Sequence, residues 1–174
     1  NGTLAVGTVA YKHEAAPDGT VTVTLSGLAD NAKTARSIVE GNTAITSAIV
    51  NEGVEVIGNR TFRKCSALET ITLPNTLTKI EQGAFQSCSN LNTCVIPASV
   101  QVIGQGAFAE CKSLTEIVIP DSVTSIGDRA FYSCDSLTSI NVNANNKYYS
   151  SVDGVLFNKN KTKLVQYPNG NKRN

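Results

Sequence analysis

Apolar residues fall into columns over residues 43–142 when the sequence is aligned in lines of 23 residues. Two of these columns lie two residues apart, which is the spacing of side chains on one face of a β-strand. The first column holds Ala48, Ile71, Cys94, Ile117 and Ile140, and the second holds Val50, Leu73, Ile96, Ile119 and Val142. The pattern predicts one short strand per line with these residues buried and the residues between them facing outward.

The apolar spacing changes from two to three after each predicted strand. Pro74, Pro97 and Pro120 directly follow three of the strands, and a residue without an amide hydrogen is suited to ending a ladder. A glycine closes the spacing of three in most lines, at positions 58, 104 and 127, with Glu81 as the exception. We expect positive φ at these glycines and a short helical or irregular return segment that packs back on the strand.

The phrase Phe-x-x-Cys closes four consecutive lines. It occupies residues 62–65, 85–88, 108–111 and 131–134, so each copy begins 23 residues after the one before. A spacing this regular is typical of one supersecondary unit stacked on itself. We interpret the phenylalanines as core that fills each unit rather than as an aromatic binding box. The predicted fold is a solenoid, mostly β with short helical or irregular return segments, in right-handed coils of 23 residues.

The sequence on either side of the repeat departs from it. Residues 1–41 contain strand-like stretches at 4–11 and 20–25 around a turn signal and predict an N-terminal β-hairpin cap, in which 29–39 fit either a short helix or an irregular link. Residues 42–142 form the repeats. Residues 143–174 predict a variant hairpin repeat turning at Asp153-Gly154 and a C-terminal tail, with 164–167 as one more strand of the repeat sheet.

Charge and hydropathy exclude some partners. The 15 Lys and Arg residues nearly balance the 14 Asp and Glu residues, so we expect no nucleic acid as a partner. No stretch approaches the roughly 20 apolar residues of a membrane helix, and we expect no membrane insertion. The chain begins at Asn1 and carries no signal-peptide pattern. We take it as a mature or trimmed chain whose targeting is not readable.

The five cysteines carry little evidence of chemistry. Four occupy one column and Cys94 occupies a strand column, and none forms the Cys-x-x-Cys pairing of a structural zinc site. A disulfide between neighbouring coils stays open on distance, since strands lie about 4.8 Å apart. Buried free thiols that act as small hydrophobes are the preferred interpretation.

Catalytic motifs are missing from the sequence. His13 is the single histidine and lies in no Ser, Cys or Asp arrangement, and the aspartates are too dispersed for a calcium loop. Gly104-Gln105-Gly106 lacks the later glycine of a phosphate loop. We predict no enzymatic activity, no cofactor and no metal.

One line of the repeat carries a specific resemblance. It reads Leu114-x-x-Ile117-x-Ile119-Pro120-x-Ser122-Val123-x-x-Ile126-Gly127-x-x-Ala130-Phe131-x-x-Cys134. This line resembles the BspA-like class of leucine-rich repeat over residues 43–142, and the first line departs from it with Ala48 and Asn51. The resemblance implies a leucine-rich repeat solenoid of a bacterial extracellular or cell-surface protein that functions in adhesion or host contact.

The outward side of the strands is the candidate binding face. Its committed residues alternate with the buried columns and are Ile49, Thr70, Thr72, Thr93, Val95, Glu116, Val118, Ser139 and Asn141. The alternative explanation of these residues is that Thr, Val and Ile simply favour strands. The face lacks the aromatic residues that stack on sugars, which favours a protein partner over a glycan, although a glycan stays possible. Tyr148 and Tyr149 are predicted to be exposed aromatic contacts.

Three functions are consistent with this sequence to different degrees. The first is a non-enzymatic module that binds a protein on a host or neighbouring cell through the outward strand face. The second is a structural spacer that presents another domain. The third, a hydrolase built on a solenoid, is disfavoured by the single histidine.

Overall fold

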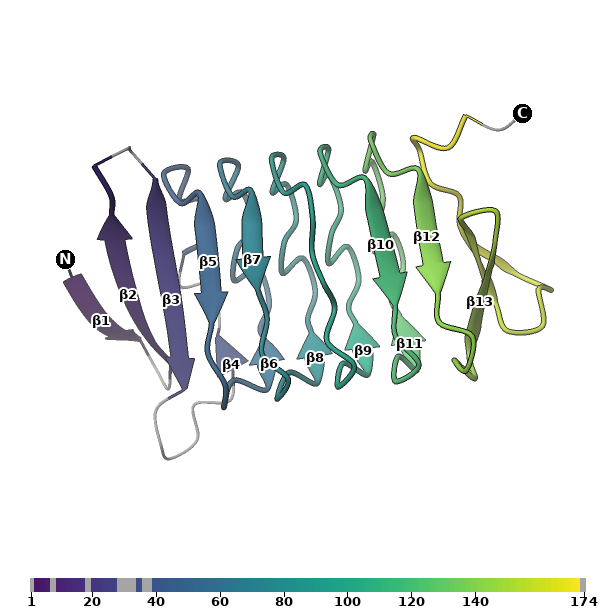
Figure 1. Cartoon of the computed structure of the whole chain (residues 1–174), viewed down its shortest axis with the longest axis horizontal. Coiled ribbons are helices and arrows are strands. Elements are labelled where there is room, and N and C mark those ends of the chain that lie inside the picture. Colours follow the sequence, from purple (N-terminus) through teal and green to yellow (C-terminus); the bar gives the residue numbers. More distant parts are fainter. Residues whose placement is uncertain (1, 7–8, 18–19, 28–33, 36–38, 173–174) are drawn as a thin grey trace.

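The computed structural model describes residues 2–6, 9–17, 20–27, 34–35 and 39–172. These residues form an elongated stack of coils, with one row of strands in front and a second row behind it (Figure 1). We number the coils by their lines: coil 1 is residues 43–65, coil 2 is 66–88, coil 3 is 89–111, coil 4 is 112–134, and coil 5 begins at 135. The solenoid of about five turns confirms the predicted fold class.

The front row contains the strands that the spacing of two predicts. Its members are β5 (Ser47–Val50), β7 (Thr70–Thr72), β10 (Glu116–Ile119) and β12 (Ser139–Val142). They pair in parallel with equivalent residues opposite each other, as Ile117 pairs with Ile140. Residues 91–97 of coil 3 form no strand, so β7 and β10 belong to separate sheets. The prediction of a strand in every coil is therefore wrong for coil 3.

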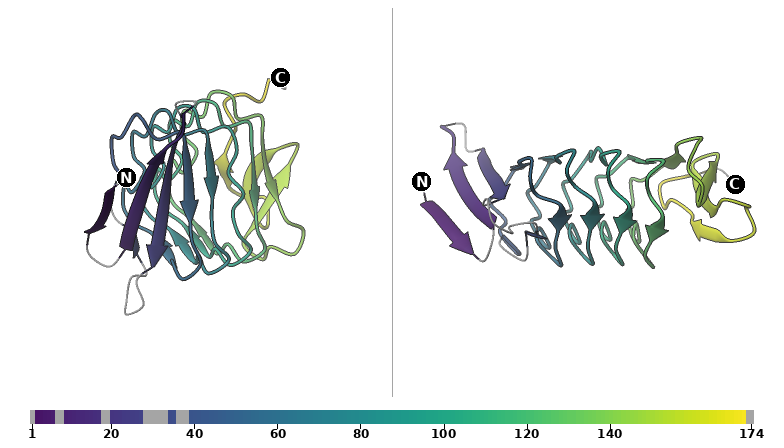
Figure 2. Two further views of the ribbon diagram at one scale, coloured as in Figure 1. Left: turned by 60° about the vertical axis from the view of Figure 1, so that its left-hand side comes forward. Right: turned by 90° about the horizontal axis from the view of Figure 1, so that it is seen from below.

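The return row is a second parallel sheet of very short strands. It consists of β4 (Thr34–Ala35), β6 (Val56–Ile57), β8 (Lys79–Ile80), β9 (Val102–Ile103) and β11 (Ser125–Ile126), in that spatial order. Among the described residues, the return segments contain these strands and turns and no helix. The irregular form of the predicted return segment is thus the one observed. The two rows enclose the interior of each coil (Figure 2).

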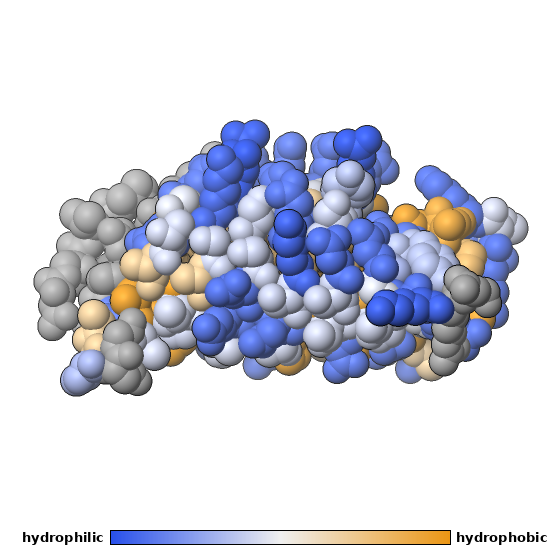
Figure 3. Space-filling model, turned by 90° about the horizontal axis from the view of Figure 1, so that it is seen from above, coloured by the Kyte–Doolittle hydropathy of each residue, from blue (hydrophilic) through white to orange (hydrophobic). Residues whose placement is uncertain are grey.

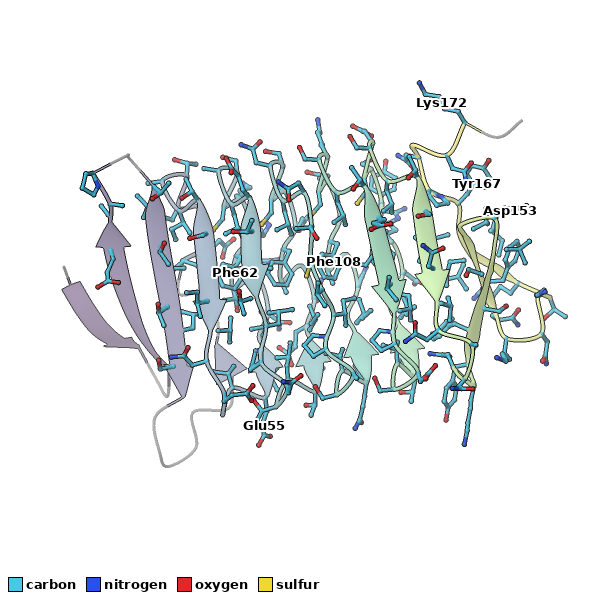
Figure 4. The ribbon with its side chains drawn as sticks, viewed as in Figure 1. Glu55, Phe62, Phe108, Asp153, Tyr167 and Lys172 are labelled. Atoms are coloured by element: carbon cyan, nitrogen blue, oxygen red, sulfur yellow. The ribbon has the colours of Figure 1, made fainter. Side chains whose placement is uncertain are left out.

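The phenylalanine column is the centre of the core, as predicted. Phe62, Phe85, Phe108 and Phe131 stack with ring centroids 5.3, 5.1 and 5.7 Å apart and interplanar angles of 5°, 14° and 10°. All four rings are at most 1% exposed. Phe62 and Phe108 lie between the front and return rows (Figure 4). Each ring therefore contacts the coil before and after it, which couples the coils into one continuous core.

The glycines at 104 and 127 serve a different purpose from the predicted one. Neither has positive φ. A Cβ atom at Gly104 would lie 2.6 Å from the backbone N of Gln82, and one at Gly127 would lie 2.4 Å from the backbone N of Gln105. The residue type is required by the close approach of neighbouring coils, and the prediction of a positive φ at these two positions is wrong.

The N-terminal strands extend the front sheet. β2 (Val9–Ala15) pairs with β3 (Val21–Gly27) in the predicted hairpin, and β1 (Gly2–Val6) adds a further antiparallel strand. The predicted single strand 4–11 is therefore two strands that pair with each other. β3 pairs in parallel with β5, so the hairpin continues the repeat sheet. Most of residues 29–39, where a helix or a link was predicted, lie outside the described residues.

The C-terminal segment forms its own antiparallel sheet. β13 (Tyr149–Val152) and β14 (Val155–Asn158) form the predicted hairpin, with positive φ at both Asp153 and Gly154. β15 (Leu164–Gln166) pairs with β14 and not with the front sheet. The prediction that residues 164–167 extend the repeat sheet is wrong, because the antiparallel edge of β14 takes that strand instead. This sheet lies against the last coils at the C-terminal end (Figure 2).

Candidate protein-binding face

The front strands hold the candidate residues in two straight columns. Parallel pairing places Ser47 beside Thr70 and Ile49 beside Thr72 in one sheet, and Glu116 beside Ser139 and Val118 beside Asn141 in the other. Because the register advances by one coil each time, equivalent side chains stand next to each other about 4.8 Å apart. The sequence therefore predicted correctly which strand residues share this face.

Three apolar residues on this face are exposed to solvent. Val95 is 79% exposed, Val118 is 45% exposed and Ile49 is 40% exposed. Thr70, Thr72, Thr93, Glu116 and Asn141 are exposed as well. An apolar side chain with most of its surface in water gains free energy when a partner covers it. Val95 therefore offers more apolar surface to a partner than either of the other two residues.

The interruption of the front sheet creates a groove beside Val95. It has a volume of about 320 Å³, and its walls include Thr93, Val95, Ala98, Glu116, Val118 and Asn143. Coil 3 supplies one wall and coil 4 the other. Four of the six residues are thus predicted face residues, and the groove adds Ala98 and Asn143, which the alternation of side chains could not identify.

The face carries little charge. Glu116 is the only ionisable residue among the nine committed positions. Threonine hydroxyls provide hydrogen-bonding groups, and on the N-terminal side the Thr22 and Ser47 hydroxyls lie 2.8 Å apart. The arrangement suits a partner that presents apolar and neutral polar groups rather than a strongly charged surface.

The Asp153-Gly154 turn limits the face on its C-terminal side. Ile140 N–H donates to the carbonyl of Gly154 over 2.8 Å, and a Cβ atom at Gly154 would lie 2.8 Å from Cβ of Ser139. Ser139 is therefore half-buried, and Asn141 remains exposed. Among the committed residues, Ser139 is the one that the C-terminal hairpin partly covers.

The two tyrosines have different environments. Tyr148 is 52% exposed, as predicted. Tyr149 is partly buried against the core, and its hydroxyl accepts a hydrogen bond of 2.8 Å from the N–H of Ile126. The prediction of an exposed Tyr149 is wrong, because its ring closes the end of the return sheet. Both tyrosines lie beside the return strand β11 and outside the two front columns.

Asn146 is a structural residue that the sequence analysis did not identify. Its side chain is 0% exposed. Its Nδ2 donates to the carbonyls of Pro120 and Val123 at 2.7 and 3.0 Å, and its Oδ1 accepts from the N–H groups of Tyr148 and Tyr149 at 2.8 Å each. The available signal was its position 23 residues after Val123, where a polar residue stands in an apolar column. Asn146 fixes the C-terminal segment to coil 4.

The cysteine column consists of buried free thiols, as preferred from the sequence. The Sγ atoms of Cys65, Cys88, Cys111 and Cys134 donate to the carbonyls of Val39, Phe62, Phe85 and Phe108 at 3.1, 3.0, 3.2 and 3.0 Å. Burial raises the pKa of Cys65 to about 11 and the pKa values of Cys94 and Cys134 to about 12. Protonated thiols are poor nucleophiles, so the column is suited to packing rather than to redox chemistry.

Other sites for chemistry were sought in the described part of the chain. No cluster of three or more His, Cys, Asp or Glu side chains suited to a metal ion occurs there. No helix there has the length and hydropathy needed to span a membrane.

The fold and its columns define a leucine-rich repeat protein. A model of the family "BspA type leucine rich repeat region (6 copies)" matches residues 38–163. The chain belongs to this family, which confirms the resemblance carried by the line from Leu114 to Cys134.

Solved structures show the same architecture. A leucine-rich repeat protein from Eubacterium ventriosum is 28% identical with a TM-score of 0.68, over 98% of this chain and 52% of that one. A leucine-rich repeat protein from T. pallidum is 29% identical with a TM-score of 0.62, over 75% of this chain and 67% of that one. A leucine-rich cell surface protein from Faecalibacterium prausnitzii is 21% identical with a TM-score of 0.56, over 97% of this chain and 62% of that one, and shows the fold alone. No curated protein matches the sequence.

Proposed function

We propose that this chain is a non-enzymatic protein-binding module that functions in adhesion. It engages its partner through the outward face of the front strands, centred on the groove between coils 3 and 4. The observation that carries the proposal is Val95, whose side chain is 79% exposed and lines that groove. Leucine-rich repeat proteins commonly mediate protein interaction, and stacked repeats supply extended binding surfaces.

The proposed location is the bacterial cell surface or the extracellular space. The description of the Faecalibacterium relative as a cell surface protein supports it. The partner in this setting is a protein of a host or neighbouring cell. The net charge of +1 offers no field that would attract nucleic acid.

Absence of catalysis belongs to the same proposal. The raised pKa values of the buried thiols of Cys65, Cys94 and Cys134 keep them protonated near neutral pH. His13 is the single histidine of the chain. Neither residue type therefore offers an activated nucleophile and base pair of the usual kind.

The test uses beads coated with the chain and their attachment to cultured epithelial cells. The double variant Val95→Glu with Val118→Glu places two charges at the groove, and we expect it to reduce attachment about tenfold or more, since leaving charges unpaired in an interface costs over 1.4 kcal/mol. The matched control is Thr124→Glu, an exposed position on the return side. Both variants must retain the unfolding transition of the parent chain.

Unchanged attachment of the double variant contradicts the proposed face. A chain whose parent form attaches to no cell type and captures no protein fits the alternative function, a spacer that holds another domain. A glycan array with the same chain separates a sugar ligand from a protein ligand. Binding to the array that the double variant loses assigns the face to a glycan instead.

A further inference from the structure

A row of backbone N–H groups on the return side joins each coil to the next. In coil 1, the N–H groups of residues 60, 62 and 64 donate to the carbonyls of residues 82, 84 and 86 at 3.1, 2.8 and 2.8 Å. In coil 2, residues 83, 85 and 87 donate to 105, 107 and 109 at 2.9, 2.7 and 2.8 Å, and in coil 3, residues 106, 108 and 110 donate to 128, 130 and 132 at 3.0, 2.8 and 2.7 Å. Three coils thus show what this row binds, namely polypeptide carbonyls at alternate residues.

The row of coil 4 is left open. Its members are the N–H groups of Arg129, Phe131 and Ser133, and none of the described residues provides them with an acceptor. The next residues in the series are 151, 153 and 155, which belong to the β13–β14 hairpin. Because the hairpin pairs with itself and packs on β12, its carbonyls do not reach the row. We call these three N–H groups the terminal row.

A groove of about 290 Å³ lies beside the terminal row. Asp128, Arg129 and Phe131 form part of one wall, and Lys163, Leu164 and Gln166 form part of the opposite wall. β15, which supplies Leu164 and Gln166, has a strand partner on one side only among the described residues. Each wall therefore presents polypeptide edges of the kind that recruit a further strand.

The charges around the groove favour an acidic occupant. Its ionisable side chains of defined charge are Arg129, Lys163 and Asp128, so cations exceed anions. Arg129 is exposed, and its guanidinium carbon lies 5.7 Å from the centroid of the Tyr132 ring. Arg129 and Ser133 also have positive φ values of 57° and 54°, and N–H groups in such turns create a concavity that attracts negative charge.

We propose that this groove binds an extended acidic peptide segment of a partner protein. The backbone carbonyls of the segment accept hydrogen bonds from the terminal row, and its acidic side chains contact Arg129 and Lys163. The binding mode adds peptide backbone to an open edge, as in strand addition. This site lies on the return side and does not depend on the front face, so either proposal can fail without the other.

The first measurement needs no ligand. Hydrogen exchange of the free chain is followed by NMR for the amides of Arg129, Phe131 and Ser133 and for the equivalent amides of Gly106, Phe108 and Glu110. We expect faster exchange in the terminal row, because coil 3 has carbonyl acceptors and coil 4 has none. Equal protection of the two rows would mean that the terminal row is already paired and would overturn the proposal.

The second measurement uses a phage-displayed library of linear peptides panned against the whole chain. We expect selected peptides to be rich in Asp and Glu and to shift the amide signals of the terminal row. Arg129→Glu should weaken a selected peptide about tenfold or more, as expected for loss of a charge-assisted contact. The matched control is Arg60→Glu, because Arg60 has the same residue type and positive φ, but its N–H already donates to Gln82.

Three results would overturn the assignment. They are a panning that yields no binding peptide, selected peptides that shift only signals of β5, β7 and β10, and equal effects of the Arg129 and Arg60 variants. Self-association of the free chain that protects the terminal row would assign the groove to a second copy rather than to an acidic partner, which also contradicts the proposal.

Discussion

The hydroxyl of Tyr149 accepts a hydrogen bond of 2.8 Å from the backbone N–H of Ile126. Ile126 is the last residue of β11, which pairs with β9 on its other side. Within the return sheet, β6, β8 and β9 each have a strand on both sides, whereas β11 has one on a single side. The tyrosine side chain therefore provides an acceptor where the next strand of the stack would have provided one.

Tyr149→Phe should destabilise the chain by about 1 kcal/mol, because it removes the acceptor of a partly buried N–H and keeps the ring. The change is measured as the free energy of unfolding in urea. Tyr148→Phe is the control, since Tyr148 is 52% exposed and its hydroxyl makes no such contact in the described structure. Equal stability of the two variants would contradict the role assigned to Tyr149.

Asn146→Ala should cost about 3 kcal/mol or more, because it removes four hydrogen bonds at a fully buried site. We also expect faster hydrogen exchange in β13 and β14, since Asn146 joins this hairpin to coil 4. The matched control is Asn145→Ala at an exposed neighbour. A loss in Asn146→Ala no larger than that in the control would show that the segment is held by other contacts.

Phe108→Ala should destabilise the chain by about 3–5 kcal/mol, as expected for removal of a buried aromatic ring. Phe108 stacks on Phe85 at 5.1 Å and on Phe131 at 5.7 Å. Its loss should therefore divide the unfolding transition into separate steps for the coils on either side, which differential scanning calorimetry detects. Wild-type melting of this variant would be incompatible with the coil alignment.

The cysteine column predicts a loss of stability at alkaline pH. Burial raises the pKa of Cys65 from 9.0 to about 11 and the pKa of Cys134 from 9.0 to about 12. Between these values the unfolded thiols lose protons that the folded thiols keep, so the free energy of unfolding falls as pH rises. The contribution is complete below about pH 9 and is lost through about pH 11–12.

The measurement is urea unfolding across this pH range, with Cys134→Ala as the comparison. We expect a shallower pH slope in the variant, because one proton fewer is released on unfolding. A thiol reagent at neutral pH should label the folded chain far more slowly than the unfolded chain. Rapid labelling of all five cysteines in the folded chain would contradict their burial.

The inward side of the coils was predictable because it repeats. Phe62, Phe85, Phe108 and Phe131 keep one spacing, and each must fill the same space in its coil, so the sequence states the packing directly. The outward columns followed from alternation with the buried residues of each strand. This reasoning placed Val95 and Val118 on one face without any knowledge of their exposure.

The remaining features depend on contacts that a single line of sequence does not contain. Residues 93–96 are as rich in strand-forming side chains as the other lines, yet they form no strand. Leu164 to Gln166 pair with β14 because that edge is closer than the front sheet, which residue spacing cannot reveal. The glycines at 104 and 127 reflect the approach of the neighbouring coil, and so their role required the stacked structure.

Photo-crosslinking from the front face tests the central claim most directly. A photoreactive phenylalanine analogue replaces Val95 in one chain and Thr124, an exposed return-side residue, in another. Each chain is irradiated on the surface of cultured epithelial cells. We predict a covalent adduct with a discrete cell-surface protein from position 95 and none from position 124. No adduct from position 95, or the same adduct from both positions, would contradict binding through the outward strand face.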